Sequence, residues 1–109
     1  MDITEETRPI PISTFLLPEG GESVPGNRFG AHQPAEQVRG NTLYVTWFAG
    51  GLRAIDISNP YLPREVGYYV PLPGKGQKTV QSNDVFHRKD GMLFLIDRFD
   101  GLEILESDL

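Results

Sequence analysis

Two stretches of the chain repeat one pattern, and this repeat constrains the fold more than any other feature of the sequence. The first is LYVTWFAGGLRAIDIS at residues 43–58, and the second is LFLIDRFDGLEILESD at residues 93–108. Each runs through alternating residues into a glycine-containing turn and back, which predicts a β-hairpin. They align without a gap, and the identical pairs are Leu43/Leu93, Gly51/Gly101 and Leu52/Leu102.

A second match lies ahead of each hairpin. PIPISTFLLPEG at residues 9–20 aligns with PREVGYYVPLPG at residues 63–74, and both read as strands bounded by prolines. The offset is 54 residues here and 50 at the hairpins, so the segment between them is shorter in the second copy. Loops absorb such differences at little cost.

Each copy therefore holds four predicted strands. Short, more polar strands at residues 32–38 and 82–87 follow the proline-bounded strand, with a loop at residues 19–30 in the first copy. No stretch has a helical period, so the chain is predicted to be all-β. The predicted units are a flexible segment at residues 1–8, a first repeat at 9–58 and a second repeat at 59–109.

The strand predicted at residues 42–48 is apolar on both sides. A sheet with one wet face would alternate apolar and polar residues, so we expect both faces of this strand to be covered. Four strands in roughly 45–50 residues is the size of a β-propeller blade, which packs against a neighbour on each face. The predicted fold is two four-stranded β-propeller-type blades, a partial propeller. The alternative is a small β-sandwich of two related hairpins.

Composition excludes several classes of function. The net charge of −5 and the lack of a Lys/Arg cluster argue against nucleic acid as a partner. The absence of cysteine excludes disulfides, thiolate zinc sites and thiol nucleophiles. No apolar run approaches the roughly 20 residues that span a bilayer, and the acidic start lacks the apolar core of a secretory signal. We expect a soluble protein with no membrane partner, in a compartment that the sequence does not reveal.

The residues also resemble a known family. LYVTWFAGGLRAIDISNPYLPREVGYYVP at residues 43–71 resembles the LVIVD-repeat β-propeller family, whose unit has the form GLRVIDISDP. Residues 82–106 are similar to the closing blade of bacterial members, and RFGAHQPAE at residues 28–36 is similar to a segment before their penultimate blade. The resemblance implies a propeller with several more blades, and an extracytoplasmic location if the chain is a piece of an exported protein.

Two blades leave apolar faces and strand edges open, because propeller units bury their faces against neighbours. The expected partners are therefore other propeller blades. These blades could belong to the same longer chain, to a second subunit, or to further copies of this chain. We favour the first two over closure by self-association.

The polar strands carry the candidate site, since the innermost strands of a propeller line its channel. The candidate ligand-binding residues are Arg28, His32, Gln33, Glu36, Asn83 and Asp84. Imidazole and carboxylate together suit a divalent metal such as zinc, iron or copper, and His32 is the candidate metal ligand. The interpretation that we favour for His32 and Asp84 is that they hydrogen-bond loop backbone and hold each blade's first turn. His87, beside Arg88 and Lys89, is predicted to be a solvated surface residue.

Two functions stay open. The first is a non-catalytic binding or assembly module that forms part of a larger propeller or complex. The second is part of a metal-dependent enzyme with its site in the propeller channel, by analogy at the level of the fold. No catalytic residue is assigned. Asp56 and Glu106 occupy equivalent positions in the two copies, and Asp56 is predicted to stabilise the turn that follows it.

Overall fold

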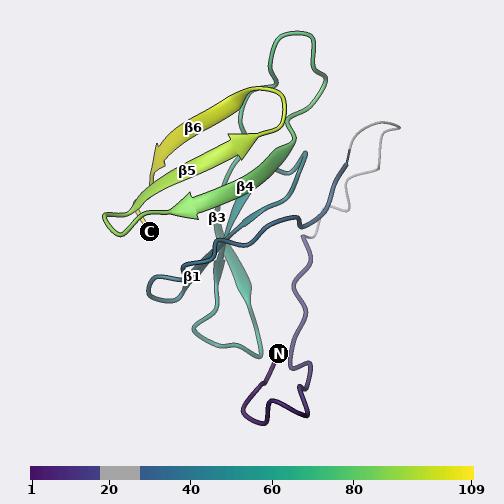
Figure 1. Ribbon diagram of the computed structural model, residues 1–109, viewed down its shortest axis with the longest axis vertical. Coiled ribbons are helices and arrows are strands. Elements are labelled where there is room, and N and C mark those ends of the chain that lie inside the picture. The colour runs from purple at the N-terminus through teal and green to yellow at the C-terminus, as the bar shows by residue number, and fades with distance from the viewer. Residues whose placement is uncertain (18–27) are drawn as a thin grey trace.

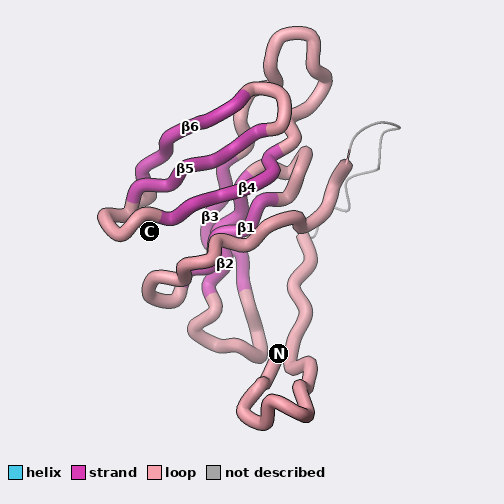
Figure 2. The backbone as a smooth tube through the Cα atoms, in the orientation of Figure 1, coloured by secondary structure: helices cyan, strands magenta, loops and turns pink. Residues whose placement is uncertain are grey.

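The computed structural model describes residues 1–17 and 28–109. Their strands are β1 (Thr42–Thr46), β2 (Leu52–Asp56), β3 (Arg64–Tyr69), β4 (Ser82–His87), β5 (Met92–Asp97) and β6 (Gly101–Glu106). Strands β1–β3 form one antiparallel sheet, named sheet 1, and β4–β6 form another, named sheet 2 (Figure 1, Figure 2). The all-β prediction is confirmed over the described residues. The loop predicted at residues 19–30 lies outside them except for its last three residues.

The prediction of four strands per sheet is wrong, because each sheet has three regular strands in the part of the chain that the structure describes. The proline-bounded strand β3 pairs with β2, the strand before it, with Leu52 opposite Tyr69. Strand β3 therefore extends the hairpin that precedes it. The repeat boundary predicted at residue 59 instead assigned this strand to the second repeat. The order of elements along the sequence does not determine which neighbour a strand joins.

The N-terminal counterpart of β3 behaves differently. Residues 9–17, the described part of the strand predicted at 9–18, lie outside both sheets, and the bridge they make joins Ile10 to Asp2. Pro9 and Pro11 lack the N–H groups that a ladder inside a sheet requires. We name residues 9–17 the N-terminal cover, because Phe15 and Leu17 within it pack against sheet 1.

An irregular fourth segment runs along the free edge of β1. The amide of His32 donates to the carbonyl of Thr46 over 2.9 Å, and the amide of Ala35 donates to the carbonyl of Tyr44 over 2.8 Å. The amide of Thr46 returns a bond to the carbonyl of Gln33 over 2.9 Å. Residues 32–35 thus pair with β1 as an antiparallel strand would, although Pro34 breaks their regularity.

The turn between β1 and β2 depends on Gly51. This residue has a φ of 75°, in the left-handed region that glycine adopts without steric cost. A Cβ atom there would also collide with the carbonyl oxygen of Tyr69 on β3. Its repeat equivalent, Gly101, has a φ of 93°. The backbone of both hairpins therefore requires the glycine that the two copies share.

The main core lies between the two sheets. Tyr44, Leu52 and Ala54 of sheet 1 pack against side chains of sheet 2, which are Val85, Leu93, Leu95 and the partly buried Leu105. Leu95 is 0% exposed. Burying a leucine side chain contributes roughly 1.5–3 kcal/mol, so this layer is a main source of cohesion between the repeats.

The opposite face of sheet 1, named the back face, carries a second cluster. Val45, Trp47 and Ile55 form its centre, and Leu43, Ile57, Phe29 and the N-terminal cover pack around them. The Phe15 and Trp47 rings meet edge to face with centroids 6.0 Å apart. The prediction that both faces of strand 42–48 are covered is confirmed, by sheet 2 on one side and by extended chain on the other. Among the described residues, no helix is long and apolar enough to cross a bilayer.

Candidate functional site

The side chain of His32 links the first repeat to the second by a hydrogen bond to a main-chain carbonyl. Its Nδ1 atom lies 2.6 Å from the carbonyl oxygen of Asn83, so that nitrogen carries the proton and donates. The hydroxyl of Thr46 lies 3.1 Å from the same carbonyl oxygen. The imidazole also stacks at a tilt on Phe48, with ring centroids 4.6 Å apart. A backbone acceptor on sheet 2 thus receives two side-chain donors from the first repeat.

The other predicted site residues are distributed around this contact. Gln33 takes part through its backbone, whose amide donates to the Thr46 hydroxyl over 3.1 Å. Arg28 is exposed and places its guanidinium carbon 5.8 Å from the centre of the Phe48 ring. The structure therefore brings His32, Gln33 and Asn83 together, with Arg28 at the border.

Glu36 and Asp84 are both exposed to solvent. The carboxylate of Asp84 accepts a hydrogen bond from the amide of the next residue, Val85, over 2.8 Å. Across residues 1–17 and 28–109, no three His, Cys, Asp or Glu side chains gather closely enough to hold a metal ion. A metal ligand role for His32 stays a prediction.

Asp97 is a buried carboxylate that the sequence analysis missed. It accepts the amide of Gln81 over 2.6 Å at Oδ2, and the amides of Phe99 and Asp100 over 2.9 and 3.2 Å at Oδ1. These three hydrogen bonds join the β5–β6 turn to the residue that precedes β4. The sequence signal was a short polar residue directly before the hairpin turn at residues 98–100. Asp56 acts similarly as predicted, since it accepts the amide of Ser58 over 2.8 Å.

His87 is buried at 7% exposure, so its prediction as a surface residue is wrong. Alternation along β4 explains this, because Val85 faces the core and His87 lies two residues further on the same side. Its ring meets the edge of Tyr44, with centroids 4.9 Å apart. Burial lowers the pKa of His87, and the positive charge of Arg39 lowers it further. Its Nδ1 atom has no partner among the described residues.

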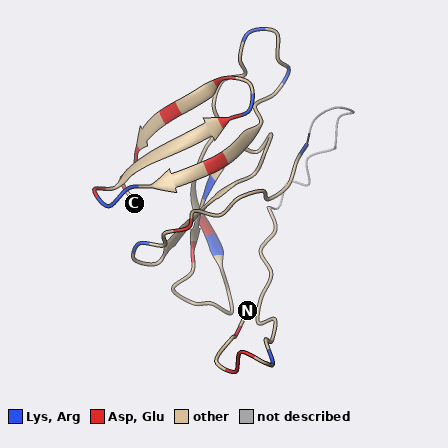
Figure 3. Cartoon of the chain, in the orientation of Figure 1, with Lys and Arg blue, Asp and Glu red and all other residues tan. Residues whose placement is uncertain are grey.

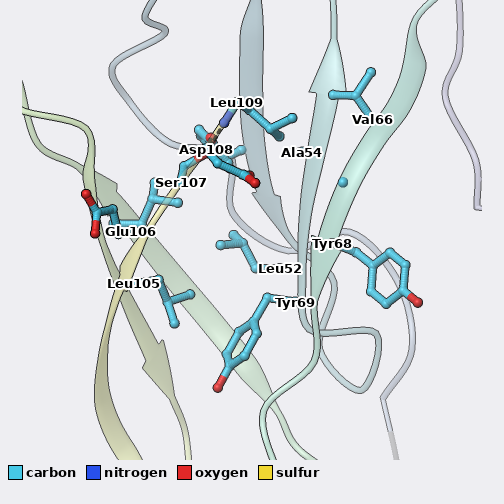
Figure 4. Close-up of a pocket in the computed structure, with 13 residues that line it drawn as sticks. Leu52, Ala54, Val66, Tyr68, Tyr69, Leu105, Glu106, Ser107, Asp108 and Leu109 are labelled. Carbon is cyan, nitrogen blue, oxygen red and sulfur yellow. Dashed lines mark hydrogen bonds between the residues drawn. The ribbon is translucent and has the colours of Figure 1, made fainter.

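A pocket of about 310 Å³ opens where the two sheets diverge (Figure 4). Its walls include Leu52 of sheet 1 and Leu105 of sheet 2, and residues 107–109 line one side. Two hydrogen bonds cross between the sheets beside it. The hydroxyls of Tyr44 and Ser107 lie 2.6 Å apart, and the Tyr69 hydroxyl donates to the Glu103 carboxylate over 2.6 Å. The Glu103 carboxylate, as the acceptor of this bond, raises the pKa of Tyr69.

The side of sheet 2 that faces away from sheet 1 is apolar and exposed. We name it the outer face, and its apolar residues are the exposed Phe86, Ile96, Leu102 and Ile104 and the partly buried Phe94. The exposed carboxylates of Asp84 and Glu106 lie on the same side, at its borders. Ladder pairing aligns Phe86 with Phe94 and Ile104 in one row. The exposed fractions of Phe86, Leu102 and Ile104 are 54%, 58% and 56%. Figure 3 shows acidic residues on each strand of sheet 2, whereas the Lys and Arg residues near this sheet lie in its turns and loops.

The two sheets of the repeat pack face to face. A comparison with known protein families finds a match in the first of them. Residues 37–70 match the LVIVD repeat. The matched residues run from just before β1 to just after β3, so the LVIVD repeat coincides with sheet 1. No curated protein and no solved structure matches the chain.

Proposed function

We propose that this chain is a β-propeller-type LVIVD module whose function is to bind and assemble with further repeat sheets. The outer face of sheet 2 is the observation that carries the proposal. Contiguous exposed apolar patches mark sites of association in soluble proteins, especially where polar groups border them. Here Asp84 lies beside Ile96 in the ladder, and Arg88 and Asp90 form an ion pair in the β4–β5 turn.

The arrangement of the two sheets supports the same proposal. Sheet 1 is stabilised because both of its faces are covered, whereas sheet 2 packs with its inner face alone in the described residues. Burying apolar surface contributes roughly 25 cal/mol per Å², so a partner sheet that covers the outer face would be stabilising. A blade in a propeller has this two-sided environment.

The test replaces Ile104 with glutamate, which puts a charge on the outer face at strand β6, in the same row as Phe94 and Phe86, without disturbing the core. Association is measured by light scattering and by sedimentation over a range of concentrations. We expect wild-type protein to associate and Ile104→Glu to weaken that association at least tenfold. Leu72→Glu is the matched control, since Leu72 is 84% exposed and lies outside the strands of both sheets. Equal association by wild type and Ile104→Glu would contradict the proposal.

A further inference from the structure

The internal repeat identifies the surface that fits the outer face, an inference that rests on the function proposed above. Aligning the hairpins pairs residues of sheet 1 with residues of sheet 2, and the pairs are Tyr44/Phe94, Leu52/Leu102 and Ala54/Ile104. The sheet 1 members of these pairs are buried against sheet 2. Their sheet 2 equivalents belong to the outer face. The outer face is therefore the repeat equivalent of a face that already packs on a sheet.

The complementary surface follows from the same alignment. Sheet 2 covers sheet 1 with Leu93, Leu95 and Leu105. The repeat equivalents of these three residues are Leu43, Val45 and Ile55, which all lie on the back face of sheet 1. The contact between the two sheets joins one surface of sheet 1 to one surface of sheet 2. The chain carries a repeat equivalent of each: the outer face corresponds to the sheet 1 surface, and the back face corresponds to the sheet 2 surface. These two equivalents lie at opposite ends of the stack of sheets.

The N-terminal cover closes the back face less firmly than a sheet would. It partly buries Phe15 and Leu17, but Leu16 is 78% exposed and Ile10 is 55% exposed. Among the described residues, the N-terminal cover is linked to the segment before β3 by a hydrogen bond, which the hydroxyl of Ser13 donates to the carbonyl of Pro60 over 2.6 Å. A segment held by two side chains and few hydrogen bonds opens at a lower cost than a paired strand.

We propose that a second copy of this chain packs its back face on the outer face, in the same orientation in which sheet 2 packs on sheet 1, and that the N-terminal cover moves aside. The contact is head to tail, because it joins two different surfaces. Repetition of such a contact gives a closed ring when the rotation per copy closes, and an open stack when it does not. We now favour a second copy as occupant over the blades of a longer chain or of a second subunit, which the sequence alone favoured, because it presents aliphatic residues equivalent to those that sheet 2 uses.

The first experiment mixes two variants that each lose one surface. Ile104→Glu keeps the back face, and Leu43→Glu keeps the outer face, with Leu43 chosen because it is only half-buried. Native mass spectrometry with one variant labelled with ¹⁵N identifies the species formed. We expect each variant alone to be monomeric and the mixture to give a one-to-one heterodimer that grows no further. Dimers of Leu43→Glu alone, with no heterodimer in the mixture, would mean that outer faces meet each other and would overturn the inference while leaving the proposed function standing.

The second experiment loosens the cover and stays informative if Leu43→Glu fails to fold. Phe15→Ser removes the ring that packs on Trp47, so we expect association to strengthen at least threefold. Adding Ile104→Glu to Phe15→Ser should abolish that gain. A gain that survives Ile104→Glu would show that the freed back face binds something other than the outer face. A second copy is excluded as the occupant if wild type and Phe15→Ser both stay monomeric at millimolar concentration. The remaining occupant would then be a sheet of another chain, or of a longer form of this one.

Discussion

The Nδ1 atom of His32 donates to the carbonyl oxygen of Asn83 across 51 positions of sequence, and this bond ties the first repeat to the second. We expect His32→Ala to lower the free energy of unfolding by about 1 kcal/mol, the usual net value of one hydrogen bond. Urea denaturation followed by tryptophan fluorescence measures it, since Trp47 directly follows β1 and is buried. Glu36→Ala, an exposed change on the same segment, should stay within about 0.5 kcal/mol of wild type. Equal effects of the two changes would show that the bond contributes nothing to stability.

His87 should make stability depend on pH in the mildly acidic range. Because burial lowers its pKa in the folded protein, the unfolded chain takes up a proton first as pH falls through 6.5, the ordinary value. Stability is therefore full above that pH and declines below it until the folded pKa is reached. Asp90, whose pKa is lowered to about 2, acts only in stronger acid. Urea midpoints between pH 7.5 and 5 should fall for wild type and stay flatter for His87→Leu, and parallel curves would refute the assignment.

The two shared turn glycines should differ in their tolerance of a side chain. Gly51→Ala adds a Cβ that meets the Tyr69 carbonyl in addition to an unfavourable φ, so we expect a loss of more than about 2 kcal/mol. Gly101→Ala has the unfavourable φ but nothing within 4 Å of the new atom, so we expect about 1 kcal/mol. Thermal and urea unfolding of the two variants compare them directly. A larger loss for Gly101→Ala would mean that β3 does not constrain the first turn.

Neighbouring residues of β5 test which side of sheet 2 is the core. Leu95 is fully buried and Ile96 is 45% exposed on the outer face. Leu95→Ala should cost about 2–5 kcal/mol through the cavity it leaves, whereas Ile96→Ala should cost less than about 1 kcal/mol in dilute protein. Chemical denaturation at low micromolar concentration keeps association out of the measurement. Comparable losses at both positions would indicate that the outer face is covered even in dilute solution.

Local patterning predicted the hairpins well. The alternation in residues 43–58 and 93–108, with glycine between the arms, located β1, β2, β5 and β6 to within about two residues. The two-sided apolar character of β1 also predicted the coverage of both of its faces. These features could be read because they depend on neighbours a few positions away, and the backbone of a hairpin is determined by its turn.

Pairing between distant segments could not be read in the same way. Residues 9–17 and β3 have similar sequences, yet one is a ladder strand and the other an extended cover, because an available edge at β2 decides the outcome. His87 was misjudged because its charged neighbours outweighed the alternation of β4. The contact of His32 was anticipated only as one of two alternatives, since its acceptor is a backbone atom that has no signature in the sequence.

That acceptor has a consequence for how the protein can vary. Every amino acid supplies a main-chain carbonyl, so the position of Asn83 can change its side chain without losing the link between the repeats. The link therefore depends on His32 and Thr46, whose side chains donate to this carbonyl oxygen. In a saturation library we expect position 83 to accept many substitutions, while positions 32 and 46 accept few, so that tolerance to mutation is unequal on the two sides of one hydrogen bond.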